Sequence, residues 1–192
     1  MSIDRIAVVG GGTMGNGIAH VAAQHGKTVR LVDLDADVLD HALETIGANL
    51  DRQIKKGRLE QGAREEVLGR IETVTDLASA VGDVQLIVEA VPERAELKAA
   101  VFSTLDEAAP DDAILASNTS SISITEIAAH TRRPEQVIGM HFMNPVPVMK
   151  LVEVIRGLAT SDETTAAVVA LSEELGKTPV EVNDFPGFVS NR

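Results

Sequence analysis

The sequence predicts a doubly wound α/β fold built on a mostly parallel sheet. Short β-branched runs alternate with amphipathic or alanine-rich stretches along all 192 residues, which is typical of parallel strands joined by crossover helices. The first expected strand leads directly into a glycine-rich turn and a helix, and an acid, Asp33, follows the second. No repeat or linker interrupts this pattern, so we expect one domain over residues 1–185.

The expected strands are short runs rich in β-branched residues, and the helices fill the stretches between them. The strands are Arg5–Val9, Thr28–Val32, Val84–Val88, Ala113–Ala116, Val137–His141, Leu151–Ile155 and Pro179–Val182. The helices are Met14–His25, Ala36–Lys56, Ala63–Arg70, Glu93–Ala108, Ile124–His130 and Asp162–Leu175. The long helical segment 36–70 is broken near Gly57 and Gly62, which predicts a helical hairpin projecting from the sheet.

Composition narrows the class of protein and its partners. There is no cysteine, which excludes disulfides and thiolate chemistry, and a net charge of -12 argues against a nucleic-acid surface. No apolar run is long enough for a signal peptide or a membrane span. We therefore expect a cytoplasmic protein without nucleic-acid or membrane partners. No metal site is expected either, because the helical histidines lack ligand spacing; they are His20, His25, His41 and His130.

The glycine-rich turn after the first strand predicts a dinucleotide site. Gly10, Gly12 and Gly15 lie between a strand and a helix, which is the context that the dinucleotide fingerprint requires. Gly10 permits the tight turn, Gly12 lets the backbone approach a pyrophosphate, and Gly15 lets the helix pack closely on the strand. Thr13 and Met14 begin the helix, where amide groups can bind phosphate. A glycine turn without a ligand is the alternative.

Asp33 selects between the two nicotinamide dinucleotides. It lies about 20 residues after the glycines, where a carboxylate can accept both ribose hydroxyls. The same carboxylate would repel the 2′-phosphate of NADP, and no arginine follows within residues 34–38 to offset it. The expected cofactor is NAD.

A histidine and a glutamate flank a proline-rich turn. If the two adjoining strands pair about Pro147, His141 and Glu153 lie opposite one another. Glu153 shares a strand face with aliphatic residues, so we expect it to be semi-buried and to need a partner. Dehydrogenation of a secondary alcohol needs a base for the hydroxyl proton, and a neutral histidine oriented by a carboxylate can supply it. The alternative is a core histidine satisfied by an acid.

Five segments together resemble the 3-hydroxyacyl-CoA dehydrogenase family, most closely its bacterial 3-hydroxybutyryl-CoA dehydrogenases. They cover essentially the whole chain in the family's order and are Gly10–Gly15, Glu89–Glu93, Ser117–Ser121, His141–Ile155 and Phe185–Arg192. The runs H-F-x-N-P-V-P-x-M-K-L-V-E and S-N-T-S-S are specific to that family among dinucleotide-binding enzymes. The resemblance implies NAD-dependent oxidation of an L-3-hydroxyacyl-CoA to the 3-ketoacyl-CoA.

The resemblance also implies roles for individual residues. His141 would be the general base and Glu153 its orienting acid, while Ser117 and Asn191 would hydrogen-bond the substrate oxygen. The positions matching family contacts to the nicotinamide half of NAD are Glu93, Lys98, Ser117 and Asn144. Glu93 and Lys98 could instead be ordinary helix-surface charges. Ser117 also ends a strand at the edge where α/β sites gather.

A basic helical face in the expected hairpin is the candidate for CoA. Arg52, Lys55 and Lys56 have i, i+3, i+4 spacing and so share one face. In the family this hairpin contacts CoA, Lys56 matches a CoA-binding position, and Arg52 is its expected companion. A solvated basic face is the alternative.

The resemblance implies a second domain. Family members continue past the Asn191 position into a helical domain that closes the cleft and forms a homodimer, so residues 186–192 are expected to begin a linker to it. We expect this chain to bind NAD with little or no turnover, since half of the cleft would be missing. Two other functions stay open: a hydroxy-acid dehydrogenase that does not use CoA, and a non-catalytic NAD-binding module.

Overall fold

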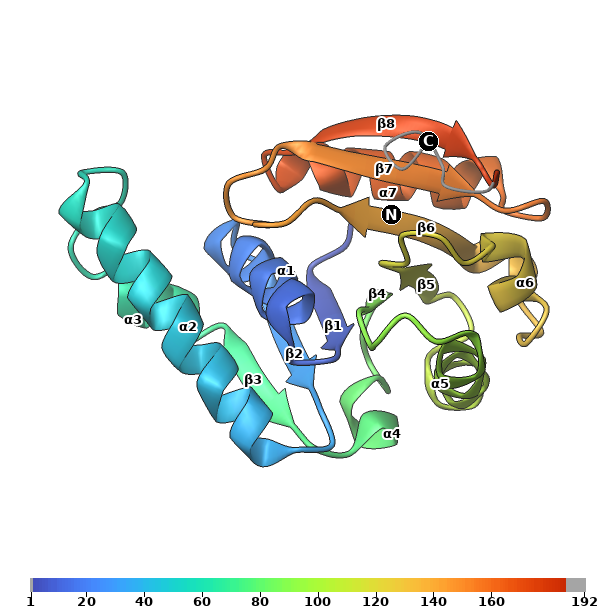
Figure 1. Ribbon diagram of the computed structural model, residues 1–192, viewed down its shortest axis with the longest axis horizontal. Helices are drawn as coiled ribbons and strands as arrows, with labels where there is room; N and C mark the ends of the chain where they lie inside the picture. Colours follow the sequence, from blue (N-terminus) through green and yellow to red (C-terminus); the bar gives the residue numbers. More distant parts are fainter. Residues whose placement is uncertain (1, 186–192) are drawn as a thin grey trace.

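In a computed structural model that describes residues 2–185, eight strands form one sheet in the order β3-β2-β1-β4-β5-β6-β7-β8 (Figure 1). Every neighbouring pair of strands is parallel except β6 and β7, which are antiparallel. The predicted doubly wound, mostly parallel α/β fold is confirmed. Within residues 2–185, no helix combines the length and the apolar character needed to cross a membrane.

The strands alternate with helices along most of the chain. The strands are β1 (Arg5–Val9), β2 (Thr28–Val32), β3 (Ile71–Val74), β4 (Leu86–Glu89), β5 (Ile114–Ser117), β6 (Val137–Phe142), β7 (Leu151–Arg156) and β8 (Thr178–Asn183). The helices are α1 (Thr13–Gln24), α2 (Ala36–Lys55), α3 (Ala63–Leu68), α4 (Leu77–Ala80), α5 (Ala95–Ala108), α6 (Ile124–Ala128), the 3₁₀ turn η1 (Pro134–Gln136) and α7 (Asp162–Glu174). Most predicted boundaries agree within one or two residues.

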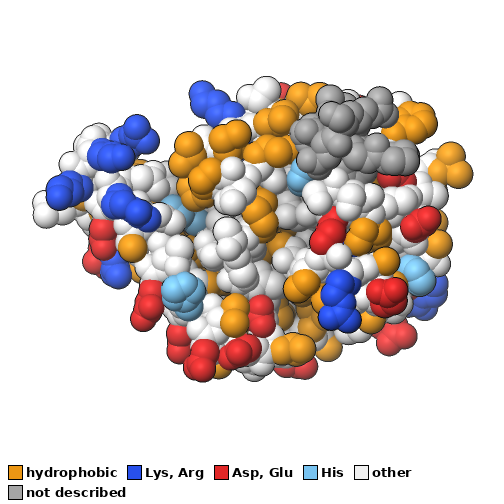
Figure 2. Space-filling model, viewed as in Figure 1, with side chains coloured by type: hydrophobic (Ala, Val, Ile, Leu, Met, Phe, Trp, Pro, Cys, Tyr) orange, Lys and Arg blue, Asp and Glu red, His pale blue; other side chains and the backbone are white. Residues whose placement is uncertain are grey.

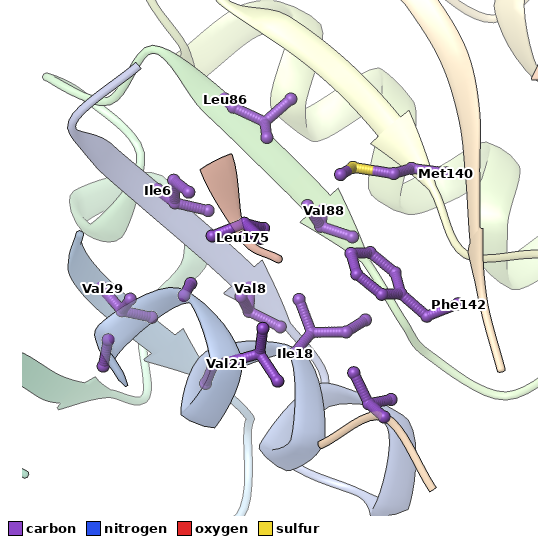
Figure 3. Close-up of a cluster of buried hydrophobic side chains, with 14 of the residues drawn as sticks. Ile6, Val8, Ile18, Val21, Val29, Leu86, Val88, Met140, Phe142 and Leu175 are labelled. Atoms are coloured by element: carbon purple, nitrogen blue, oxygen red, sulfur yellow. The ribbon is translucent and has the colours of Figure 1, made fainter. Parts of the chain in front are cut away.

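Two hydrophobic layers lie on opposite faces of the sheet, because alternate residues of each strand point to opposite sides. On β1, Ile6 and Val8 pack with α1, α2 and α7, whereas Ala7 and Val9 pack with α4, α5 and α6. Figure 3 shows part of the first layer, where Ile18 of α1 lies between strand side chains. Each such aliphatic side chain contributes about 1.5–3 kcal/mol by leaving water. The central strands are therefore covered on both faces.

The expected helical hairpin is formed by α2 and α3, which lie beyond α1 at one end of the molecule (Figure 1). Asp35 begins α2 by accepting a hydrogen bond from the amide of Asp37. Gly57 and Gly62 both have positive φ, so the chain reverses between the helices at residues that tolerate this conformation. The sequence-predicted break is confirmed at both glycines.

Three elements were not predicted: β3, α4 and the 3₁₀ turn η1. The strand β3 lies at the sheet edge beside β2, and the single-turn helix α4 follows it after Asp76, whose carboxylate accepts from the amide of Ser79. The residues of β3 are only partly buried, so it lacks the continuous apolar run that marks the inner strands. Its pairing with β2 supplies the backbone partners that define it as a strand.

Candidate active site

The glycine-rich turn has the geometry that a dinucleotide cradle requires. Gly10 has a φ of 103°, and a Cβ built there would lie 2.7 Å from the carbonyl oxygen of Ala90. A Cβ at Gly15 would lie 1.7 Å from the oxygen of Gly10, so α1 packs against the turn only because residue 15 is glycine. At Gly12, by contrast, no atom lies within 4 Å of a built Cβ. Open space therefore faces the start of α1, where unpaired amides favour phosphate.

Asp33 follows β2 beside this turn. One carboxylate oxygen accepts the amide of Gly11 at 2.8 Å, and the other accepts the amide of Asp35 at 3.2 Å. These bonds fix the carboxylate at the cavity wall, in the position that the sequence predicts for a ribose ligand. The residues present therefore fit an NAD cofactor.

A cavity of about 850 Å³ extends from the glycine turn across the carboxyl ends of the central strands. Its lining includes Gly10, Gly12, Thr13, Met14 and Asp33. Its other polar lining residues are Glu93, Asn118, Ser120, His141 and Asn144. This edge of the sheet, where the strand order reverses between β1 and β4, is the usual ligand site of doubly wound folds.

His141 and Glu153 face one another across β6 and β7. The antiparallel register pairs them, as the turn about Pro147 predicts, and the Nδ1 atom of His141 lies 2.7 Å from the Oε2 atom of Glu153. Glu153 is 1% exposed, so it is buried rather than semi-buried as expected, because both faces of β7 are covered. His141 is 8% exposed and lines the cavity. The imidazole is thus held by a buried carboxylate at the cavity wall.

Glu93 holds the loop that follows β5. Its Oε1 atom accepts hydrogen bonds from the hydroxyl of Thr119 and from the amides of Ser120 and Ser121, the Ser120 amide at 2.8 Å. Burial by itself raises the pKa of Glu93, but these hydrogen bonds and the charge of Lys98 outweigh burial and lower the pKa to about 2. Glu93 is therefore ionised at neutral pH and fixes the polar loop.

Lys98 and Ser117 lie in a buried polar group around Glu89 rather than at the cavity surface. The Nζ atom of Lys98 donates to Glu89 at 2.7 Å and lies 3.4 Å from Glu93, and the hydroxyl of Ser117 donates to Glu89 at 2.7 Å. Both side chains are fully buried, and neither lines the cavity. The contacts with cofactor and substrate that the family resemblance implies for them stay predictions.

Ser120 lines the cavity, whereas Ser117 does not. It lies three residues further along the same S-N-T-S-S run and lines the cavity with His141. Asn118, another member of the run, also lines the cavity, and its Oδ1 atom accepts the amide of Phe142 at 2.9 Å. Strand alternation alone did not show which residues of the run line the cavity. Asn191 lies outside the described residues.

A second cavity of about 610 Å³ adjoins the first. It shares Gly12, Thr13 and Asn144 with the first cavity and extends along α2 past Thr45 and Asn49. The side chain of Arg52 donates to Asn49, while Lys56 is exposed at the end of the helix. Figure 2 shows lysine and arginine side chains gathered at the end of the molecule that α2 and α3 form.

The glycine turn, Asp33 and the cavity at the switch in strand order define a dinucleotide-binding domain of the Rossmann type. A family model described as the NAD binding domain of 3-hydroxyacyl-CoA dehydrogenase matches residues 5–185. The chain belongs to the 3-hydroxyacyl-CoA dehydrogenase family, and its cofactor is NAD.

Individual relatives support this assignment. A probable 3-hydroxybutyryl-CoA dehydrogenase of Bacillus subtilis (strain 168) is 52% identical over the whole chain, which covers 67% of that protein. The 3-hydroxyadipyl-CoA dehydrogenase of Escherichia coli (strain K12) is 46% identical, and the chain covers 40% of it. The crystal structure of (S)-3-hydroxybutyryl-CoA dehydrogenase from Ralstonia eutropha matches all of this chain, which covers 67% of it, with a TM-score of 0.97 and 46% identity. The chain thus spans two thirds or less of these relatives.

Proposed function

We propose that this chain contributes the NAD site and the general base to reversible oxidation of an L-3-hydroxyacyl-CoA. The single observation that carries the proposal is the position of the His141–Glu153 pair at the wall of the cavity that also holds the glycine turn. An NAD cradle and a base oriented by a carboxylate are the two protein parts that alcohol dehydrogenation needs. The relatives named 3-hydroxybutyryl-CoA dehydrogenase favour the CoA ester as substrate.

In this reaction His141 accepts the hydroxyl proton of the substrate. If Nδ1–H donates to Glu153, Nε2 carries the lone pair and accepts the hydroxyl proton of the substrate as the carbonyl forms. The buried carboxylate stabilises the imidazolium that results, because an opposite charge 2.7 Å away favours it. Bound NAD supplies the acceptor for the hydride that leaves carbon. In the reverse direction the imidazolium returns the proton.

Ser120, rather than Ser117, is our candidate for the hydroxyl that contacts the substrate oxygen. Ser120 lines the cavity together with His141, whereas the hydroxyl of Ser117 is buried against Glu89. Asn144 and Glu93 also line the cavity and are our candidates for the nicotinamide half of the cofactor. The roles of Asn191 and of residues 186–192 as a linker stay predictions, as do the second domain and the homodimer.

A single-turnover assay tests the general base. With the chain in excess over NADH, acetoacetyl-CoA is added and the loss of NADH absorbance is followed. Because proton transfer by a positioned side chain contributes about 10²-fold or more, His141→Gln should slow this loss at least about 100-fold while NADH binding is kept. The exposed His130→Gln variant is the matched control and should behave as the parent chain. Measurable NADH loss that is equally fast in the parent and in His141→Gln would refute the proposal.

A competition assay tests the CoA part of the substrate. Free CoA should displace acetoacetyl-CoA, and Lys56→Ala should weaken the displacement, because an exposed lysine at the end of α2 can pair with CoA phosphates. Glu44→Ala, an exposed change on the same helix, is the control. A chain that uses a CoA-free hydroxy acid would show no competition by free CoA.

A further inference from the structure

Three charged side chains form a continuous buried-to-exposed group beside the cavity. Glu89 is fully buried at the end of β4, Lys98 is fully buried on α5, and Glu93 lines the cavity with a side chain that is 36% exposed. Lys98 lies 2.7 Å from Glu89 and 3.4 Å from Glu93, so one cation is shared between two carboxylates. We call these three side chains the Glu–Lys–Glu group.

The Glu–Lys–Glu group carries one net negative charge. Besides Lys98, Glu89 accepts the amide of Val91 at 2.7 Å and the hydroxyl of Ser117 at 2.7 Å, which are neutral donors suited to a carboxylate. Within residues 2–185, Lys98 is the one basic side chain that forms an ion pair with either glutamate. Two carboxylates and one ammonium therefore leave a charge of -1, with the Glu89–Lys98 pair buried and the Glu93 carboxylate partly exposed at the cavity.

The charge lies at the part of the cavity assigned to the nicotinamide. Glu93 lines the same cavity as Asp33, the glycine turn and His141. It also accepts the amide of Ser120 in the loop after β5, and Asn118 of that loop accepts the amide of Phe142, the residue after His141. The nicotinamide ring is cationic in NAD⁺ and neutral in NADH, whereas the rest of the dinucleotide is the same. A fixed charge beside the ring therefore acts on one redox state and not on the other.

We propose that the Glu–Lys–Glu group determines the relative affinity of the site for the two redox states of the cofactor, favouring NAD⁺ through its net negative charge. Glu89 is then a specificity residue that acts from inside the protein without contacting the cofactor. The inference depends on the proposed orientation of NAD, with the nicotinamide beside His141. It adds to that proposal a means by which the protein binds NAD⁺ more tightly relative to NADH.

The test compares the dissociation constants of NAD⁺ and NADH, measured by titration calorimetry on the 192-residue chain and its variants. Glu89→Gln and Glu93→Gln each remove one negative charge and keep an amide that can hydrogen-bond. Each should raise the ratio of Kd for NAD⁺ to Kd for NADH by about tenfold, since a unit charge near the ring has an effect of this order. Glu96→Gln removes the same charge from the exposed first turn of α5 and should leave the ratio unchanged.

Comparing the variants at Glu89 and Glu93 distinguishes an effect of charge from the loss of a direct contact with the cofactor. A rise in Glu93→Gln alone would mean a lost cofactor contact and would overturn the inference, as would an unchanged ratio in both variants. If circular dichroism shows that Glu89→Gln does not fold, the inference is tested on Glu93→Gln alone. The ratio of Kd for NAD⁺ to Kd for NADH is then measured at increasing salt concentrations. A shift caused by the charge of this partly exposed carboxylate shrinks as the salt concentration increases. A shift of the same size at every salt concentration would indicate a lost contact and would overturn the inference. A parent chain that binds neither dinucleotide would instead refute the proposed function.

Discussion

Replacing His20 by leucine should reduce the loss of unfolding free energy that this fold shows at acid pH. His20 is completely buried on α1, and within residues 2–185 its Nδ1 atom has no hydrogen-bond partner. Burial is the main cause that lowers the pKa of His20 from 6.5 to about 4; the nearby charges of Lys177 and His25 act in the same direction and the side chain of Gln24 opposes them. The imidazole is therefore neutral in the folded protein at neutral pH.

The direction and the size of the change in stability with pH follow from the pKa values of His20 in the unfolded and folded states. Between pH 6.5 and about 4 the unfolded chain binds a proton at His20 that the folded chain does not bind, so stability is lost as the pH falls through this window. The difference between a pKa of 6.5 in the unfolded chain and about 4 in the folded protein corresponds to about 3 kcal/mol of unfolding free energy. This is a large fraction of the stability of a typical domain, about 5–15 kcal/mol.

Urea denaturation followed by circular dichroism at a series of pH values measures this contribution. The free energy of unfolding of the parent chain should fall by about 3 kcal/mol more than that of His20→Leu between neutral pH and about pH 4. The control is His41→Leu, because the side chain of His41 is 79% exposed and should give the parent's pH dependence. Parallel pH profiles for the parent and His20→Leu would refute the reasoning that the buried imidazole opposes protonation.

Three further predictions concern the cofactor site and its support. Gly15→Ala places a Cβ 1.7 Å from the oxygen of Gly10 and must displace α1, so NAD should bind at least about tenfold more weakly by calorimetry. Unchanged NAD affinity would contradict the claim that the glycine turn and α1 form the NAD site. Asp33→Asn removes the charge that repels a 2′-phosphate, so the preference for NAD over NADP should fall about tenfold; a constant ratio of the two Kd values would contradict this role. Lys177→Met removes the hydrogen bonds from Nζ to the carbonyls of Val146 and Met149, and urea unfolding should show a loss of about 2 kcal/mol, whereas no loss would mean that the loop is held by other contacts.

The local sequence determined the elements that depend on near neighbours. The glycine turn between a strand and a helix, Asp33 after the second strand, and the breaks at Gly57 and Gly62 all follow from backbone preferences within a few residues. The pairing of His141 with Glu153 was also predictable, because residues equally spaced about a turn meet in an antiparallel pair.

The tertiary structure decided which side chains reach the cavity. Ser117 and Ser120 are three residues apart in one polar run, and only the packing of β5 between β4 and β6 shows that the first is buried and the second lines the cavity. The Glu–Lys–Glu group joins the end of β4 to α5, so its spacing in the chain carries no signal of the ion pairs. Burial and charge pairing depend on elements brought together from distant parts of the chain, and a local pattern cannot specify them.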